Sequence, residues 1–482
     1  MQFYIKKYLI FSIFIIFKIY TTYSQNKVFD AIVSADGTGD YMYIKSALNY
    51  NKKLIFIKNG KYKEKISIDA SKSNIKLIGE SKENVIITYD DYVGKNSSIS
   101  TTYDTYTLKV CSKGFYAENI TIENTATQAQ AVALIVEADT VVFKNCIIKG
   151  FQDSHYAKSG RQFYYNCTIF GDVDFIFGNG TAYFENCTIV SRNRKPGYIT
   201  APGKPYIKTK KPDNTVLLHG FVFKNCILTY ENGLFENSTY LGRPWEDSAS
   251  SVFLNCVLDA HIKSEGWSVW TTDVTNDGFD NHLTSFFGEY KSVDRNNYLI
   301  DISKRVNWSI QLFDNDTFYY SVNYFLINWN PYKKIELVKP PSNIFFTNDS
   351  LYWEKIENAR GYIVYRNDEI DAITTVNSLS LNGQTGLYKI KTVSINGSLS
   401  DFSWPFMVSK IVKNIKEKKY IIENNQIFLN DNAYISFYDI TGRLISKCFT
   451  SSIYDVGFLK TGIYIIHFRF KDFETFEKII VQ

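Results

Sequence analysis

Two aspartates, Asp153 and Asp174, could do chemistry together. They lie in a stretch rich in aromatic and β-branched residues, "GFQDSHYAKSGRQFYYNCTIFGDVDFIFGNG" (150–180). A carboxylate beside an apolar surface loses hydration and must be compensated. One explanation is turn formation, because Asp is common in turns. The other is catalysis: two carboxyls that share one surface hold one group protonated and leave the other ionised, so one is an acid and the other a nucleophile.

An internal repeat indicates which elements carry this pair. Phrases containing Asn-Cys before apolar residues recur, and "AENITIEN" around Asn119 is the same phrase without its cysteine. The irregular later spacings indicate insertions between the coils of a parallel β-helix, whose equivalent residues stack about 4.8 Å apart. We expect the Asn-Cys steps to face inward as a ladder of small buried side chains. The repeated cysteines are Cys146, Cys167, Cys187, Cys226 and Cys256.

The repeat also relates the candidate residues to one another. Asp153 and Asp174 are separated by 21 residues, as are the first two repeated cysteines, so they should occupy nearly equivalent places on adjacent coils. Gln130 and Gln152 are separated by 22 residues and should lie on neighbouring coils beside the pair, as catalytic groups or as part of a side-chain ladder. Asp174 and Arg243 each precede a repeated cysteine by 13 residues, so we expect the guanidinium on the same face.

Composition favours several mostly β domains. The 482 residues include 36 Phe and 36 Tyr, which fit half-buried strand surfaces. A net charge of +5 is small for this length and does not imply a nucleic-acid partner. Five of seven cysteines follow the repeat, which favours buried thiols over a disulfide framework, with Cys111 and Cys448 unassigned. The spacing of cysteines and histidines gives no zinc motif, and we expect neither a metal nor another cofactor.

The N-terminus has the layout of a secretory signal peptide. Lys6 and Lys7 precede an apolar run from Tyr8 to Phe17 and a short polar segment that ends at Ser24. Residues 1–24 are therefore expected to be removed, leaving no membrane span, although Lys18 keeps an uncleaved interfacial anchor open as the alternative.

Several motifs resemble those of the pectin methylesterase (pectinesterase) family. The resemblance covers most of residues 27–330 and implies an all-β, right-handed parallel β-helix, followed here by small β-sandwich domains. It also implies a carboxylic ester hydrolase that converts methyl-esterified pectin (homogalacturonan) to pectate and methanol, with a role in pectin degradation and plant cell wall modification. The motifs, in family order, are "QAVAL" (130–134), "GFQD" (150–153), "RQFYYNC" (161–167), "GDVDFIFGN" (171–179) and "LGRPW" (241–245).

The resemblance implies a role for each matching residue. Asp174 matches the family's nucleophile, which forms an acyl-enzyme. Asp153 matches the acid that protonates departing methanol and then the base that activates water. Gln130 and Gln152 match the amides that stabilise the oxyanion, and Arg243 matches the residue that holds the nucleophile.

Aromatic residues are candidates for substrate binding. The "RPW" context favours Trp245 as a residue beside the sugar rings over a packed core aromatic, while Phe151 and Trp267, with Trp270, are further candidates. "QDSHY" departs from the commoner Gln-Asp-Thr-Leu-Tyr, and His155 is interpreted as a solvated turn residue.

The chain changes character near Pro340. Residues 340–406 resemble a fibronectin type III module, and residues 412–482 resemble the C-terminal sorting domain of type IX secretion in Bacteroidetes, for which another small adhesive β module is the alternative. The resemblance implies the type IX machinery as a partner and a secreted or cell-surface location reached through the periplasm. Because a β-helix buries its core coil by coil, we expect residues up to 339 to fold without these modules.

Two other functions fit a β-helix. A polysaccharide lyase would need calcium-binding carboxylates and a basic proton abstractor, which the motifs do not match. A silent pectin-binding protein would not require the set Gln130, Gln152, Asp153, Asp174 and Arg243.

Overall fold

A computed structural model describes residues 27–335, 338–409, 420–423, 426–429, 431–451, 453–471 and 474–481. The predicted signal peptide, residues 1–24, lies outside the described residues.

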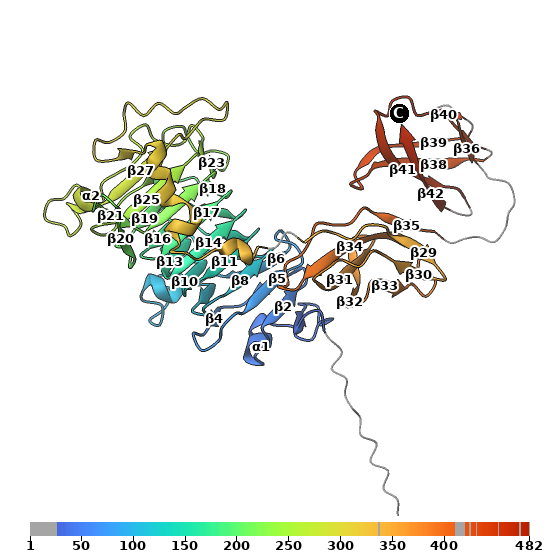
Figure 1. Ribbon diagram of the computed structural model, residues 1–482, viewed down its shortest axis with the longest axis horizontal. Coiled ribbons are helices and arrows are strands. Elements are labelled where there is room, and N and C mark those ends of the chain that lie inside the picture. The colour runs from blue at the N-terminus through green and yellow to red at the C-terminus, as the bar shows by residue number, and fades with distance from the viewer. Residues whose placement is uncertain are drawn as a thin grey trace, which may run out of the picture.

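Three parallel sheets wind into a β-helix, which confirms the predicted fold (Figure 1). Each full coil adds one strand to each sheet, in the chain order sheet A, sheet B, sheet C. Sheet A contains β1 (Ala31–Val33), β2 (Leu54–Ile57), β5 (Lys76–Gly79), β8 (Tyr116–Glu118), β11 (Val141–Lys144), β14 (Arg161–Tyr165), β17 (Thr181–Glu185), β22 (Phe221–Lys224), β25 (Ser250–Leu254), β27 (Phe286–Tyr290) and β28 (Ile310–Gln311). Sheet B contains β3 (Gly60–Lys63), β6 (Val85–Tyr89), β9 (Thr121–Asn124), β12 (Ile147–Lys149), β15 (Thr168–Gly171), β18 (Thr188–Ser191), β23 (Ile227–Tyr230) and β26 (Val257–Leu258). Sheet C contains β4 (Ile66–Ile68), β7 (Leu108–Val110), β10 (Leu134–Glu137), β13 (His155–Ser159), β16 (Ile176–Gly178), β19 (Gly197–Pro202) and β24 (Thr239–Gly242).

Short elements decorate the coils. A hairpin of β20 (Lys208–Lys210) and β21 (Val216–Leu218) occupies the insertion between β19 and β22. The helices of the β-helix domain are α1 (Ile44–Asn49), α2 (Asn281–Thr284), α3 (Val322–Phe325) and the 3-10 helices η1 (Thr102–Thr105), η2 (Asp314–Tyr320) and η3 (Pro331–Lys333).

The Asn-Cys repeat forms the turn from sheet A to sheet B. All five cysteines are buried in the core, as predicted. The asparagines do not join that ladder: the side chains of Asn166, Asn186, Asn225 and Asn255 are exposed. Each has a φ between 52° and 54°. A one-residue turn needs this left-handed backbone, which Asn tolerates better than most residues, so the repeat selects Asn for backbone geometry and Cys for packing.

After the last coil the chain runs back along the outer face of sheet A. Residues 313–335, here called the strap, carry η2, α3 and η3. Tyr183 of β17 donates a hydrogen bond to the carbonyl of Tyr320 at 2.9 Å, and Lys334 donates to the carbonyl of Gly114, just before β8, at 3.0 Å. The strap therefore returns the chain toward the N-terminal coils (Figure 1).

Two small antiparallel sandwiches follow the strap, as the sequence predicted for the fold class. The first pairs the sheet β29 (Phe345–Thr347), β30 (Ser350–Tyr352), β33 (Ser378–Ser380) with the sheet β32 (Glu369–Thr374), β31 (Ala359–Arg366), β34 (Gly386–Ser394), β35 (Phe406–Val408). The second pairs β36 (Tyr420–Glu423), β37 (Gln426–Leu429), β40 (Ile453–Asp455) with β39 (Leu444–Thr450), β38 (Ala433–Asp439), β41 (Gly462–Arg469), β42 (Glu474–Val481).

The first sandwich is docked on sheet A. Its Ile363 and Val393 share one apolar cluster with Phe56 and Ile78 of the β-helix. Within the same contact, Ser398 donates a 2.7 Å hydrogen bond to buried Glu118, whose ion-pair partner is Lys144 at 3.0 Å. The β-helix thus buries part of its apolar surface against the first sandwich, and the independence of residues up to 339 stays a prediction.

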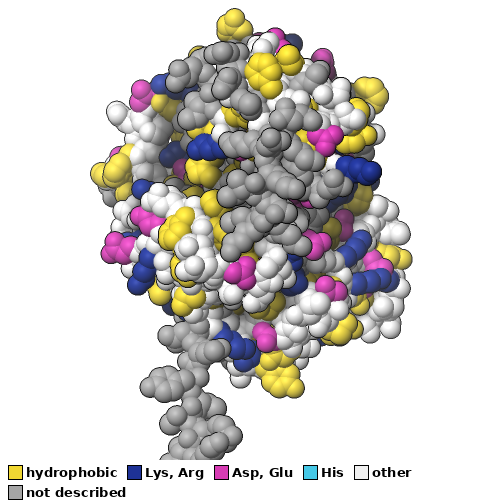
Figure 2. Space-filling model, turned by 90° about the vertical axis from the view of Figure 1, so that its right-hand side faces the viewer, with side chains coloured by type: hydrophobic (Ala, Val, Ile, Leu, Met, Phe, Trp, Pro, Cys, Tyr) yellow, Lys and Arg dark blue, Asp and Glu magenta, His cyan; other side chains and the backbone are white. Residues whose placement is uncertain are grey.

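Two further observations concern the charge on the surface and the length of the helices. On the face that carries the sandwiches, basic and acidic side chains of the described residues are intermingled, without one dominant sign (Figure 2). Within the described part of the chain, no helix combines the length and apolar character needed to cross a membrane.

Candidate active site

Asp153 and Asp174 occupy equivalent turns between sheets B and C. His155 of β13 pairs with Ile176 of β16, so each aspartate lies two residues before a paired position. Their φ angles are 65° and 50°, in the left-handed region that Asp tolerates. Both side chains are largely buried. The predicted equivalence on adjacent coils is therefore confirmed.

Arg243 reaches Asp174 from two coils away. Its Nε donates to Oδ1 at 2.9 Å and its Nη2 to Oδ2 at 2.6 Å, a two-pronged ion pair. The shared spacing of 13 residues does not reflect the register: Ile176 pairs with Thr200 and Thr200 with Gly242. Arg243 therefore aligns one residue past Ile176, and only its long side chain brings the guanidinium to Asp174.

Two aromatic rings flank the guanidinium. Cζ of Arg243 lies 4.0 Å from the ring centroid of Tyr198, on the intervening strand β19, and 4.4 Å from that of Trp270. Tyr198 was missed by sequence reasoning, because β19 belongs to a coil with an insertion and carries no catalytic motif. The strand register could have revealed Tyr198: it lies two residues before Thr200, just as Asp174 lies two residues before Ile176, which pairs with Thr200.

The two carboxyls differ in environment. Burial, and then the negative charge of Asp174, raise the pKa of the Asp153 carboxyl well above its usual range. Burial also raises the pKa of Asp174, but the hydrogen bonds and charge of Arg243 oppose that rise. No described residue forms a hydrogen bond with the Asp153 carboxyl. The arrangement therefore favours a protonated Asp153 beside an ionised Asp174.

Gln130 and Gln152 lie beside this pair. The amide N–H of Ala131 donates to the carbonyl of Gln152 at 3.2 Å, which brings the two glutamines onto adjacent coils. Both side chains are half-buried, and within the described residues neither makes a hydrogen bond to another side chain. Their amide groups are free to donate to a ligand.

An aromatic surface covers the outer face of sheet C next to the carboxyls. Trp245 lies edge-on to Phe177, with ring centroids 5.9 Å apart, and Phe177 stacks on Tyr156 at 4.3 Å. Phe151 is half-buried, and the guanidinium of Arg192 lies 3.9 Å from its ring centroid. These positions keep Trp245 and Phe151 available as candidates for substrate contact.

The interpretation of Trp267 as a substrate contact is wrong. Its side chain is 1% exposed and packs inside the β-helix against Phe253 and Phe287. The β-bridge between Gly242 and Trp267 explains this orientation, because it turns the indole inward, whereas Trp270 reaches the outer face.

His155 is not a solvated turn residue. It begins β13, is fully buried, and lies with its ring 5.0 Å from that of Tyr164 in the core. Its Nδ1 lies 3.2 Å from the carbonyl of Leu134, while Nε2 has no hydrogen-bond partner. Asp153 lies in the left-handed turn before β13, so strand alternation starts only after it, and the first strand residue, His155, points inward.

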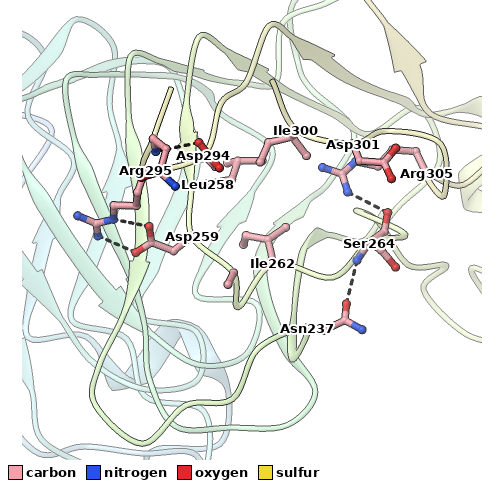
Figure 3. A pocket seen from close by; sticks show the side chains of 12 residues that line it. Asn237, Leu258, Asp259, Ile262, Ser264, Asp294, Arg295, Ile300, Asp301 and Arg305 are labelled. Atoms are coloured by element: carbon pink, nitrogen blue, oxygen red, sulfur yellow. Dashed lines mark hydrogen bonds and ion pairs between the residues drawn. The ribbon is translucent and has the colours of Figure 1, made fainter. Parts of the chain in front are cut away.

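A separate cavity of about 400 Å³ lies at the C-terminal end of the β-helix (Figure 3). Both arginines that line it are paired within the protein: Arg295 forms a two-pronged pair with Asp259, and Arg305 forms one with Glu289. None of the candidate catalytic residues lines it.

Comparisons with known proteins identify the family of the chain. The family model "Pectinesterase" matches residues 30–328. A pectinesterase from Petunia integrifolia is 38% identical over 296 residues, which cover 58% of this chain and 74% of that protein. A probable pectinesterase/pectinesterase inhibitor 12 from Arabidopsis thaliana is 37% identical over 289 residues, or 58% of this chain; the match spans only 50% of that relative. The solved pectin methylesterase from carrot superposes with a TM-score of 0.54 at 30% identity, covering 62% of this chain and 93% of that one. The chain belongs to the pectinesterase family.

Proposed function

We propose that the protein is a pectinesterase that hydrolyses C6 methyl esters of homogalacturonan to pectate and methanol. The observation that carries the proposal is the pair of buried carboxyls with opposite environments, Asp174 held by Arg243 and Asp153 without a cation of its own. Family membership supports the substrate class.

Asp174 is the proposed nucleophile. Its ionised carboxylate attacks the ester carbonyl carbon and forms an acyl-enzyme, while Arg243 orients it and keeps it ionised. The amides of Gln130 and Gln152 donate hydrogen bonds to the developing oxyanion without being titrated themselves.

Asp153 is the proposed acid and base. In its protonated form it gives a proton to departing methanol; as a carboxylate it then takes a proton from the water that attacks the acyl-enzyme. Hydrolysis releases the free galacturonate and restores both carboxyls. Trp245 and Phe151 are proposed to contact the sugar rings beside this centre.

A methanol-release assay on methylated pectin tests the proposal. Wild type should release methanol, and folded Asp174→Asn should release almost none, because an amide of similar shape is not a nucleophile. Chelation with EDTA should leave turnover intact. Turnover by folded Asp174→Asn, or calcium-dependent formation of unsaturated products, would replace the esterase proposal with another mechanism.

We also propose the roles of the flanking regions: residues 1–24 as a signal peptide, 27–330 as the catalytic domain, 340–406 as a fibronectin type III-like module, and 412–482 as a type IX sorting domain. With a signal peptide and a sorting domain, the enzyme would be exported through the periplasm and then secreted or displayed at the cell surface. Two sandwich domains after the β-helix support the modular division. Deletion of 412–482 should trap active enzyme in the periplasm of the native host, and normal surface delivery without it would overturn the sorting role.

A further inference from the structure

Lysines and tyrosines alternate at the N-terminal end of the outer face of sheet C. The ammonium groups of Lys109 and Lys158 each lie 4.7 Å from the ring centroid of Tyr103. Lys109 also lies 4.7 Å from the ring of Tyr106, and Lys65 lies 4.9 Å from that ring. The order along this cluster is therefore Lys65, Tyr106, Lys109, Tyr103, Lys158.

The central lysine of this cluster, Lys109, forms no direct ion pair, although its charge acts with that of Lys158 on Glu137. Lys65 pairs with Asp91 at 2.6 Å, and Lys158 pairs with Glu137 at 2.9 Å. Across the described part of the chain, no carboxylate lies within 4 Å of the Lys109 ammonium. Tyrosine rings favour a cation but do not neutralise it, so this position retains a positive charge for an outside anion.

The tyrosines are held in place before any ligand arrives. The Tyr103 hydroxyl donates to Glu137 at 2.8 Å. The η1 segment that carries Tyr103 begins with a capping box between Thr101 and Asp104. At its end, the Thr105 carbonyl accepts from Asn124 at 3.0 Å, and the Thr105 hydroxyl accepts from the backbone N–H of Val132 at 2.9 Å. Such preorganisation reduces the entropy lost on binding.

Register links Lys109 to the proposed active site. Lys109 pairs with Ile135, Ile135 with Tyr156, and Tyr156 with Phe177, so these residues form one row across the outer face of sheet C. Two strand spacings, roughly 10 Å, separate the backbones of Lys109 and Tyr156. The aromatic cluster on this face includes Tyr103 and Tyr106 as well as Trp245 beside the carboxyl pair.

We propose that Lys109, framed by Tyr103 and Tyr106, binds the carboxylate of a galacturonate unit that has already lost its methyl ester. The inference rests on the proposed esterase function, since each turnover creates such a carboxylate on the same polymer. A neutral methyl ester cannot form the ion pair, and the tyrosine rings hold the Lys109 ammonium in place without neutralising it. The site therefore directs the enzyme to esters that neighbour demethylated units.

Lys109→Met tests the site through two substrates. Relative to wild type, the variant should have a KM for partly demethylated pectin that is higher by about five- to tenfold, the loss expected for one charge-assisted contact. Its KM for highly methylated pectin should rise much less. The selective effect should shrink as salt increases, and Lys109→Arg should restore it. Lys149→Met is the matched control, because Lys149 also lies over an aromatic ring, that of Phe170 at 5.8 Å, but on sheet B.

A binding measurement separates this proposal from the esterase proposal. Titration calorimetry with an unesterified galacturonate oligomer should show binding by wild type and by Lys149→Met that Lys109→Met weakens about five- to tenfold. Absence of methanol release by wild type would overturn the esterase function, whatever the calorimetry shows. Methanol release together with equal oligomer binding by wild type and Lys109→Met, or equal KM changes for both pectins, would overturn the Lys109 site.

Discussion

Arg243 binds Asp174 across a coil to which neither residue belongs. Strand β19 lies between β16 and β24, and the guanidinium spans it on the ring of Tyr198. The fixed planar fork of arginine allows two parallel hydrogen bonds over that span, while the rings of Tyr198 and Trp270 restrict its orientation. The nucleophile is thus oriented by a residue distant in both sequence and coil.

Arg243→Lys should reduce kcat by on the order of 10²-fold, because an ammonium keeps the charge but not the two-pronged geometry. Loss of that geometry should also move the acid limb of the kcat profile to higher pH, since Asp174 would ionise less readily. Methanol-release kinetics between pH 4 and 8 measure both effects. Tyr198→Phe, which keeps the ring, is the control and should stay within about twofold of wild type; a similar loss in that variant would contradict the positioning by the ring face.

Asp153→Asn should abolish most activity while stabilising the fold at neutral pH. The amide cannot donate and recover a proton, so kcat should fall by about 10³-fold. Because burial and Asp174 raise the pKa of Asp153, wild type is less stable above the unfolded pKa of 3.8, where the unfolded chain releases this proton more readily than the folded protein.

Thermal unfolding at several pH values checks this stability effect. The rise in Tm of Asp153→Asn over wild type should be absent near pH 3, where Asp153 is protonated in both states, and should grow as the pH increases. A variant less stable than wild type at pH 7 would show that the Asp153 carboxylate is compensated in the fold.

The sequence predicted features that depend on repetition. The spacing between Cys146 and Cys167 predicted the length of one coil, and the same spacing predicted that Asp153 and Asp174 occupy equivalent places on adjacent coils. Features set by insertions were not predictable in this way: the register of Arg243 and the inward orientation of Trp267 follow from strand pairing after long loops. The left-handed turns formed by the repeat asparagines were also not predicted, because a sequence period shows which residues are equivalent but not where their side chains point.

His155→Leu should protect the protein against mild acid. Burial lowers the pKa of His155 from 6.5 to about 4, so between these values the unfolded chain binds a proton that the folded protein excludes. The free energy of unfolding of wild type should therefore fall by up to about 3 kcal/mol as the pH falls from about 6.5 to 4. The variant should not show this part of the loss. Urea unfolding at pH 7 and pH 4.5 measures the difference. Parallel losses in both proteins would mean that protonated His155 is accommodated in the core.

Ser398→Ala should weaken the docking of the first sandwich on the β-helix without altering catalysis. In a buried contact, Ser398 donates to Glu118 and accepts from Lys144 at 3.0 Å and from Tyr116 at 3.4 Å. Losing these bonds should lower the free energy of unfolding by about 2 kcal/mol. Ser380→Ala, at an exposed position of the same sandwich, is the matched control and should change it by less than about 0.5 kcal/mol. Urea unfolding of the chain without residues 1–24 measures the stability, and methanol release measures kcat. Equal stability of the two variants would show that the Ser398 hydrogen bonds contribute little to the fold, in line with the predicted independence of the β-helix.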